Sequence, residues 1–284
     1  MIPVPSLPQA LDAGLRSQVD SWDEGRLHIS DLAVGVPMPD GKCPRELWLR
    51  LRGAKKKDVS AGTLLMWDHG KRIHERLVEI IRQNLNSGWQ IEAVERQVEL
   101  YGITGRYDTR LYNADEGWEI IVDFKSIRGR AFNWLVEAKP SNVIQVQGYV
   151  TAADGDAGLV FYIDREGQNQ AKQFYAQRDD SKVWQAVKAA KAVARGNEPG
   201  ILGPKIVIAK NKGPDSVKLE MPWQCSYCDF CGPSCPGALP PKMRELGIVG
   251  HVDGGVFAPK VQDKEVVTVV ETLLEMQGYA PLPF

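Results

Sequence analysis

The sequence predicts an α/β (α+β) protein whose mixed central β-sheet is flanked by helices. Two observations lead to this prediction. Segments with helical periodicity and segments typical of strands follow one another in the order helix, strands, helix, strands, helix. The strand segments come in two groups separated by a helix, which is the pattern of a mixed sheet covered by helices.

The first predicted elements are helical. A short helix is expected over residues 11–22, followed by a Pro- and Gly-rich turn over residues 35–41. Pro44 is a favoured first residue of a helix, and the helix that it begins ends at Gly53. A stronger helix is predicted over residues 60–84, where apolar residues recur at approximately helical spacing.

A block of strands follows. Residues 90–101 alternate between polar and apolar, a turn follows at Gly102, and a second strand is expected over residues 105–112. Residues 114–117 have the composition of a hairpin turn and lead into a continuous hydrophobic strand over residues 118–124. The block therefore predicts antiparallel neighbours joined by short turns.

The remaining predicted elements complete the pattern. A helix is expected over residues 140–153, because proline opens it, and strands are expected over residues 159–163 and 171–177. A further helix is expected over residues 180–195. Residues 196–222 are rich in Gly, Pro and Lys and lead into a cluster of cysteines.

Composition excludes several classes of protein. The 284 residues are 43% hydrophobic and 25% charged, which is typical of a globular protein large enough to bury a full core. No run of apolar residues is long enough for a transmembrane helix, and no secretory signal is recognised, so a cytoplasmic protein without membrane contact is expected. The net charge of −1 does not by itself indicate nucleic-acid binding, although a positive groove can lie on a neutral protein.

An acidic residue and a lysine share one face of the strand over residues 118–124 and its continuation. Asp123 and Lys125 are two positions apart, so both side chains project to the same side. A carboxylate that binds a hard divalent cation, with a lysine that orients or helps to deprotonate water, suits phosphodiester hydrolysis. An ion pair at the end of a strand is the alternative interpretation of this pair taken alone.

Other residues around this pair strengthen the hydrolytic interpretation. Asp108 lies in a glycine-flanked segment on the preceding strand, which an antiparallel hairpin can bring beside Asp123. Two carboxylates from neighbouring strands make a plausible Mg²⁺ or Mn²⁺ site. His74 lies within the upstream helix, and Gln145 and Tyr149 lie on one face of the downstream helix.

Cysteines stand on both sides of these residues. Cys225, Cys228, Cys231 and Cys235 lie in one short segment, whereas Cys43 lies far upstream. In a reducing compartment, clustered cysteines more often bind metal than form disulfides, and an odd number fits poorly with a disulfide framework. Zinc is the default metal for four cysteines, and an iron–sulfur cluster is the alternative.

The order of these motifs resembles the RecB-type branch of the PD-(D/E)XK nuclease superfamily. The motifs run in the order His, Gly-x-x-Asp, Asp-x-Lys and Gln-x-x-x-Tyr, and the resemblance covers about residues 28–236. One cysteine before the core and several after it resemble the iron–sulfur members of that branch. These include the CRISPR-associated RecB-like exonucleases, their phage relatives and the AddB-type nuclease module. The resemblance implies a restriction-endonuclease-like core clamped by a cysteine-ligated metal cluster.

The resemblance also implies roles for individual residues. His74, Asp108, Asp123 and the carbonyl of Phe124 would hold the catalytic Mg²⁺ or Mn²⁺. Lys125 would activate water and stabilise developing negative charge. Gln145 and Tyr149, on one face of their helix, would position the DNA strand or support the site.

For the cysteines, the resemblance favours a [4Fe–4S] cluster over zinc. Its ligands would be Cys43, Cys225, Cys228 and Cys235, because the longer gap before Cys235 fits the family better than the gap before Cys231. Cys231 is the alternative fourth ligand. A zinc site made by the four clustered cysteines alone, with Cys43 buried and free, is the other interpretation.

The implied function is a metal-dependent DNA exonuclease that prefers single-stranded DNA or DNA ends, with endonuclease activity as a possible addition. It would act in recombination or repair, phage DNA metabolism or CRISPR adaptation, with the proteins of those processes as candidate partners. A non-catalytic DNA-binding subunit or a zinc-stapled interaction subunit on the same fold is the alternative. Residues 1–236 are predicted as the nuclease domain and residues 237–284 as a C-terminal extension of unknown role, with a helix over residues 265–278.

Overall fold

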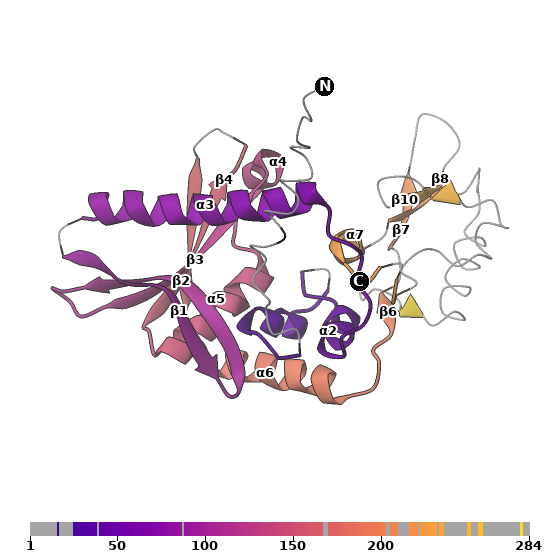
Figure 1. Ribbon diagram of the computed structural model, residues 1–284, viewed down its shortest axis with the longest axis horizontal. Helices are drawn as coiled ribbons and strands as arrows, with labels where there is room; N and C mark the ends of the chain where they lie inside the picture. Colours follow the sequence, from indigo (N-terminus) through magenta and orange to yellow (C-terminus); the bar gives the residue numbers. More distant parts are fainter. Residues whose placement is uncertain are drawn as a thin grey trace, which may run out of the picture. The chain divides into compact units, whose positions relative to one another are not determined.

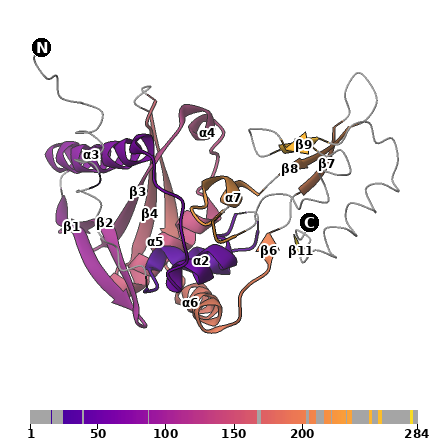
Figure 2. The same cartoon turned by 45° about the vertical axis from the view of Figure 1, so that its right-hand side comes forward.

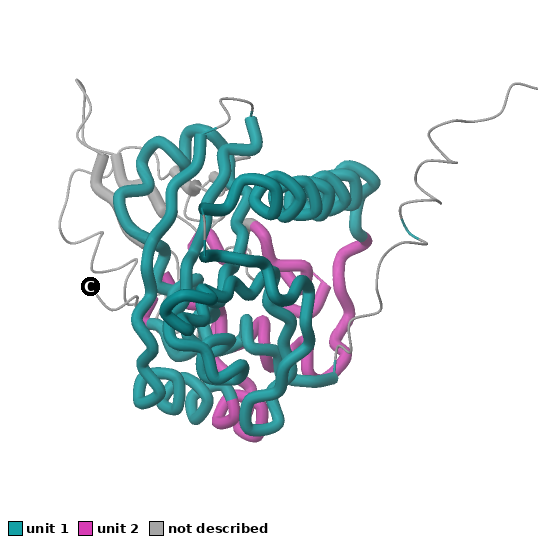
Figure 3. The backbone as a smooth tube through the Cα atoms, turned by 90° about the vertical axis from the view of Figure 1, so that its left-hand side faces the viewer, with its two compact units in different colours: residues 1–36, 59–190 teal, residues 37–58, 191–284 magenta. Residues whose placement is uncertain are grey.

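The structure is a computed structural model in which two compact units are distinguished (Figure 3). Unit 1 comprises Met1–Val36 and Val59–Ala190, and unit 2 comprises Pro37–Asp58 and Lys191–Phe284. The residues that the structure describes are 16, 25–38, 40–86, 88–166, 170–202, 205–209, 216–220, 222–231, 233–235, 249–250, 255–257 and 279–280.

Unit 1 contains a five-stranded mixed sheet. Its strands are β1 (Trp89–Leu100), β2 (Ile103–Asn113), β3 (Glu119–Ile127), β4 (Ala157–Asp164) and β5 (Ala171–Gln177). They lie in sequence order across the sheet, as Figure 1 shows for β1 to β4. All neighbours are antiparallel except β3 and β4, which are parallel. The β1–β2 connection is a tight turn at Tyr101 and Gly102, both with positive φ, which matches the backbone twist of a two-residue hairpin.

Helices cover both faces of this sheet. The long helix α3 (Ala61–Asn84) lies across one face and α5 (Pro140–Ala153) lies against the other (Figures 1 and 2). The short 3₁₀ helix η1 (Ile29–Gly35) packs on α5, followed by α6 (Asp180–Arg195). A five-residue helix, α4 (Gly129–Asn133), comes directly after β3.

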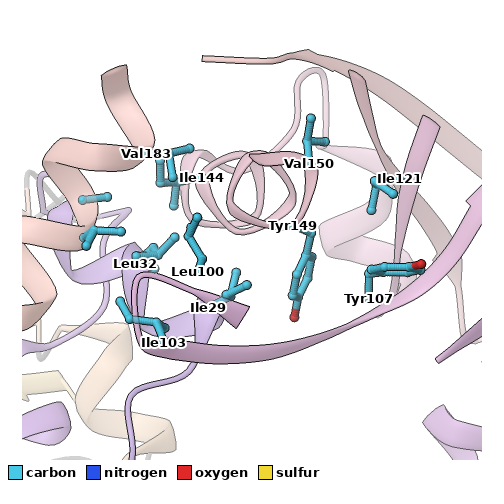
Figure 4. Packing of buried hydrophobic residues seen from close by; sticks show 13 residues of the cluster. Ile29, Leu32, Leu100, Ile103, Tyr107, Ile121, Ile144, Tyr149, Val150 and Val183 are labelled. Atoms are coloured by element: carbon cyan, nitrogen blue, oxygen red, sulfur yellow. The ribbon is translucent and has the colours of Figure 1, made fainter. Parts of the chain in front are cut away.

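The alternation of β3 divides its side chains between two hydrophobic clusters. Val122 and Phe124 pack with Val78 of α3, whereas Ile121 packs with Ile144 and other residues of the α5 face. Figure 4 shows this second cluster, in which residues from η1, the β1–β2 hairpin and α5 meet. Odd-numbered residues of β3 therefore point towards α5, and this places Asp123 and Lys125 on that side.

Unit 2 contains the cysteines and smaller elements. Its helices are α2 (Pro44–Leu51) and α7 (Trp223–Tyr227). A four-stranded sheet has the order β7-β8-β10-β9, from Lys205–Ala209, Ser216–Glu220, Gly255–Phe257 and Val249–Gly250. The short strands β6 (Ile201–Leu202) and β11 (Tyr279–Ala280) pair in parallel.

Most of the predicted elements are confirmed within a few residues. The helices over residues 60–84, 140–153 and 180–195 and all five strands of the main sheet are present. The helices η1 and α4 and the strands of unit 2 were missed, because short segments carry no periodicity.

The helices expected over residues 11–22 and 265–278 lie outside the described residues, apart from Arg16, and the proposed boundary at residue 236 stays a prediction. Among the described helices, none has the length and apolar character needed to cross a bilayer.

Candidate active site and cysteine cluster

The centre of the candidate active site is the end of β3. Asp123 and Lys125 project from one face of this strand, and Asp123 Oδ2 lies 2.8 Å from Lys125 Nζ. The Asp123 side chain is only 4% exposed. The parallel ladder with β4 continues through both residues to Ile127, so the backbone on this side is fixed. The predicted arrangement of these two side chains on one face is confirmed.

Asp108 joins the site through the neighbouring strand. The antiparallel ladder between β2 and β3 pairs Thr109 with Val122 and stops there. Beyond that point the Phe124 N–H donates to Asp108 Oδ2 at 2.6 Å. The side chain of Asp108 thus replaces a backbone partner and is held beside Asp123, as the hairpin predicted.

His74 reaches the site from α3. Its Nδ1 atom lies 3.8 Å from Asp108 Oδ2, and its ring packs edge-on against Phe124 with centroids 5.7 Å apart. The Phe124 side chain is buried against α3. The expected role of the Phe124 carbonyl as a metal ligand stays a prediction.

Gln145 and Tyr149 connect the lysine to α5. Lys125 Nζ donates to Gln145 Oε1 at 3.3 Å, and Gln145 Nε2 donates to the Tyr149 hydroxyl at 3.1 Å. The Tyr149 ring extends from α5 towards the hairpin (Figure 4). Gly105 of β2 makes room for it, because a Cβ atom there would lie 2.8 Å from the ring. The packing of Tyr149 thus explains why the Gly-x-x-Asp segment has a glycine at position 105.

Burial and mutual repulsion change the ionisation of the acidic residues. Burial, and after it the nearby carboxylate of Asp123, raises the pKa of Asp108 to about 7. Burial also raises the pKa of Asp123, against the opposing effect of the Lys125 ammonium. Two carboxylates are therefore held together where their combined negative charge is not fully compensated.

The basic residues respond to the same surroundings. Burial, together with the charge of Lys125, lowers the pKa of His74 to about 4, so its imidazole is neutral at pH 7. Burial tends to lower the pKa of Lys125, but Asp123 and Asp108 outweigh it and the pKa is raised. Lys125 therefore stays a cation at neutral pH.

The donor set fits a hard divalent cation. Asp123 Oδ2 is a fully buried atom that makes no hydrogen bond of good geometry within the described part of the chain, although Lys125 Nζ is near. Carboxylate oxygens and a neutral imidazole are ligands that Mg²⁺ or Mn²⁺ accepts. Among the described residues, no group of three His, Cys, Asp or Glu side chains is already at ligand spacing.

The five cysteines meet in unit 2, where they form what we call the cysteine cluster. Cys225 lies in α7 and Cys228 follows it, while Cys43 precedes the first turn of α2. All five cysteine side chains line one cavity of about 10 Å³. They are Cys43, Cys225, Cys228, Cys231 and Cys235. The thiols are free of disulfides. Cys43 thus lies beside cysteines that are 182 or more positions away in the sequence, as the prediction of a metal clamp requires.

Hydrogen bonds hold the two chain segments of this cluster together. Gln224 Nε2 donates to the Gly41 carbonyl at 2.9 Å, and the Lys57 N–H donates to the Asp229 carbonyl at 2.7 Å. Ser234 Oγ donates to the Lys55 carbonyl at 2.7 Å. Sequence reasoning did not predict these contacts, because single polar residues in irregular segments give no recognisable pattern.

The thiols of Cys225 and Cys228 are protonated at neutral pH in the absence of metal. Burial and the nearby Cys43 raise the pKa of Cys225 to about 12. Burial and Glu46 raise the pKa of Cys228 to about 11. Four converging thiols form the donor set of structural zinc and of a [4Fe–4S] cluster alike.

Comparison with known proteins identifies the family to which the chain belongs. Residues 33–236 match the model of the PD-(D/E)XK nuclease superfamily. No curated protein sequence matches the chain significantly. The crystal structure of the protein SSO0001 is similar in fold, with 18% identity, a TM-score of 0.50 and coverage of 82% of this chain and 97% of that one.

Two further solved structures are similar at a lower level. An alkaline exonuclease from Laribacter hongkongensis is 14% identical with a TM-score of 0.44, covering 65% of this chain and 90% of its own. A phage-related exonuclease from Haemophilus somnus 129PT is 18% identical with a TM-score of 0.41, covering 60% of this chain and 93% of its own.

Proposed function

Because the chain belongs to the PD-(D/E)XK nuclease superfamily, we propose that it is a metal-dependent DNA exonuclease acting on single-stranded DNA or DNA ends. The observation that carries this proposal is the joint placement of Asp108, Asp123 and Lys125 on two paired strands. A surface ion pair would be exposed, whereas Asp123 is buried and shares its site with a second carboxylate.

The acidic residues and the histidine would hold the cation. Asp108 and Asp123 supply the carboxylates, and His74 supplies a neutral imidazole nitrogen. When bound, Mg²⁺ or Mn²⁺ supplies positive charge beside the phosphate that is being hydrolysed. Asp108 gives up its proton when a cation binds, since a ligating carboxylate is deprotonated.

Lys125 has a separate task in the proposed reaction. Its raised pKa keeps the ammonium charged, so it stabilises the negative charge that develops on the phosphate. Gln145 holds the ammonium by accepting its hydrogen bond, and Tyr149 fixes the amide of Gln145. The pair on α5 thus acts through Lys125 as positioning residues.

The cysteine cluster supports a structural metal clamp in unit 2. Following the family resemblance, we assign a [4Fe–4S] cluster to Cys43, Cys225, Cys228 and Cys235, with Cys231 as the alternative fourth ligand. Zinc is the alternative metal, since four cysteine thiolates also form structural zinc sites. Metal binding would release the protons of the buried thiols and join the two chain segments.

The direct test of the nuclease proposal compares wild-type protein with Asp123→Ala. Labelled single-stranded and double-stranded DNA are incubated with Mn²⁺ or Mg²⁺, with the label at either end, so that activity, polarity and strand preference are read together. We expect degradation by the wild type and a loss of roughly 100-fold or more in the variant. Equal activity of the variant would refute the site, and binding without cleavage by the wild type would favour a non-catalytic DNA-binding subunit.

A further inference from the structure

An exposed aromatic residue lies just beyond the active strand. Trp134 follows α4, and 68% of its surface is accessible, although large apolar side chains are usually buried. The guanidinium carbon of Arg130 lies 4.6 Å from the centre of the Trp134 ring. A tryptophan and an arginine stacked in this way present planar groups on which nucleobases stack.

The residues on either side of Trp134 hold it in place. Phe132 and Leu135 are buried in a hydrophobic cluster with Val146 of α5. Lys172 Nζ donates to the carbonyls of Phe132 and Leu135, at 2.8 and 2.9 Å. The exposed ring is therefore carried by an anchored backbone, and little conformational freedom is lost when a ligand stacks on it.

A cavity of about 380 Å³ opens beside this pair. Its lining consists of Gly129, Arg130, Asn133, Trp134, Asp164 and Glu166. This size falls within the range of small-molecule sites.

The lining of the cavity includes two carboxylates, those of Asp164 and Glu166. Asp164 is 6% exposed and accepts from the Glu166 N–H at 2.9 Å, while Glu166 accepts from the Gly129 N–H at 3.2 Å. Carboxylates repel phosphate but accept hydrogen bonds from the amino groups on base edges. The charge therefore selects a base for this cavity and leaves the sugar–phosphate backbone outside.

The cavity lies on the catalytic face of the sheet. In the β3–β4 ladder, Lys125 pairs with Tyr162 and Ile127 pairs with Asp164, one same-face step further along. The anchoring cluster contains Val146 and Tyr162, so the α4 segment packs on the side that carries Asp123 and Lys125. Gly129 lies four positions after Lys125, at most about 13–14 Å of extended chain, which a short stretch of single strand bridges.

We propose that Arg130 and Trp134 form a stacking platform that holds one unpaired base of the DNA substrate in the cavity beside Asp164. The platform gives the enzyme its preference for single-stranded DNA, because a base within a duplex cannot enter the cavity. This inference rests on the proposed function and adds a binding subsite outside the cation-binding residues.

The test measures equilibrium binding of full-length protein to a labelled duplex with a short single-stranded tail of either polarity. Ca²⁺ replaces Mg²⁺, and gels confirm that the DNA stays intact. We expect Trp134→Ala to weaken binding about 5- to 150-fold, the range for loss of one stacked base. Trp134→Phe retains most of the affinity. The matched control is Trp118→Ala, which removes another exposed tryptophan of unit 1 and leaves affinity unchanged.

A second arm separates stacking from general electrostatic attraction. One abasic site is moved through the tail, and at one position it should weaken wild-type binding as much as Trp134→Ala does. The same abasic site should cost the variant nothing further, because both changes remove one contact. Additive losses, unchanged binding by Trp134→Ala, or equal loss with a blunt duplex would each overturn the platform.

The two proposals fail differently in these experiments. Wild-type protein that degrades DNA while Trp134→Ala binds and degrades it equally well sustains the nuclease and refutes the platform. Wild-type protein that neither binds nor degrades DNA refutes the proposed function, and the platform falls with it. Arg130→Lys keeps the charge but loses the planar group, so an affinity loss in that variant supports stacking over charge alone.

Discussion

The carboxylate site, formed by Asp108 and Asp123, and the cysteine cluster bring together side chains of types that can bind metals, and they do so by different routes. Asp108 and Asp123 are fifteen positions apart, and the pairing of adjacent strands places them side by side. Cys43 and Cys225 are 182 positions apart and meet through irregular segments joined by side-chain hydrogen bonds. A site built on a strand ladder is positioned by the backbone itself, whereas the cluster depends on packing and on any metal that joins its segments.

The two sites also differ in the ionisation of their side chains. The carboxylate site holds two acidic groups near one lysine and one neutral histidine, so repulsion remains between the acids. The cysteine cluster avoids repulsion by keeping its buried thiols protonated. Metal binding would displace protons at both sites, from Asp108 in the first and from the buried thiols in the second. In the first site it would also offset the repulsion between the two acids.

The largest expected effect concerns the cluster. Cys225→Ala should lower the metal content to well below that of the wild type and lower the melting temperature by roughly 10 °C, since a lost structural metal costs several kcal/mol. Metal analysis and thermal unfolding measure both quantities. Iron with absorbance near 400 nm would identify an iron–sulfur cluster, and stoichiometric zinc in a colourless protein would identify zinc.

Cys231→Ala is the matched variant for this experiment. If Cys235 is the fourth ligand, the Cys231 variant keeps its metal and its melting temperature, whereas Cys235→Ala loses both. The opposite result would exchange the two assignments. Retention of metal and stability by Cys225→Ala would show that the cluster is not a clamp.

A smaller effect on the melting temperature is expected from the repulsion between Asp108 and Asp123. The folded pKa of Asp108 is raised to about 7, above its unfolded value. Its contribution to stability is therefore fully present below the unfolded pKa and is lost as pH rises through 7. In metal-free protein, Asp108→Asn should raise the melting temperature by a few degrees at pH 8, where the wild type bears this cost, and change it little at pH 4.

Two controls accompany that measurement. Mg²⁺ should raise the melting temperature of the wild type at pH 8 and have much less effect on Asp108→Asn, because the cation binds the folded state through this carboxylate. The variant should also lose nuclease activity while gaining stability. A variant that is less stable than the wild type at pH 8 would contradict the repulsion inferred between the two acids.

The smallest effect is expected from the positioning residues. Gln145→Ala should lower kcat roughly 10-fold, the loss expected for about 1.5 kcal/mol, which is the lower end of the range for a hydrogen bond to a charged group. Single-turnover cleavage measures the rate, and KM should change little. Gln147→Ala is the matched control on the same helix, because Gln147 donates instead to the Gln177 carbonyl at 2.8 Å. It should lower stability without lowering kcat.

The sequence predicted the relative placement of Asp108, Asp123 and Lys125 because this geometry follows from local rules. Strand alternation placed Asp123 and Lys125 on one face, and a hairpin brought Asp108 to the next strand. Helical spacing placed Gln145 beside Tyr149. Each relation spans only a few positions within an element or between neighbouring strands.

Other features escaped sequence reasoning. The α4 segment with Arg130 and Trp134 is too short to show periodicity, and nothing in its sequence reveals that Lys172 caps its carbonyls. The role of Gly105 became clear only when Tyr149 was found packed against it. These contacts join distant segments, and no local pattern encodes which segments will meet.

The sequence by itself determined the order of elements, the face of β3 that carries the reactive groups and the residue types suited to metal binding. The tertiary structure decided how deeply those groups are buried, which side chains cross between segments and what ionisation results. The physical reason is that periodicity is set by backbone geometry within a few residues. Desolvation and long-range contacts instead depend on everything that packs around a group.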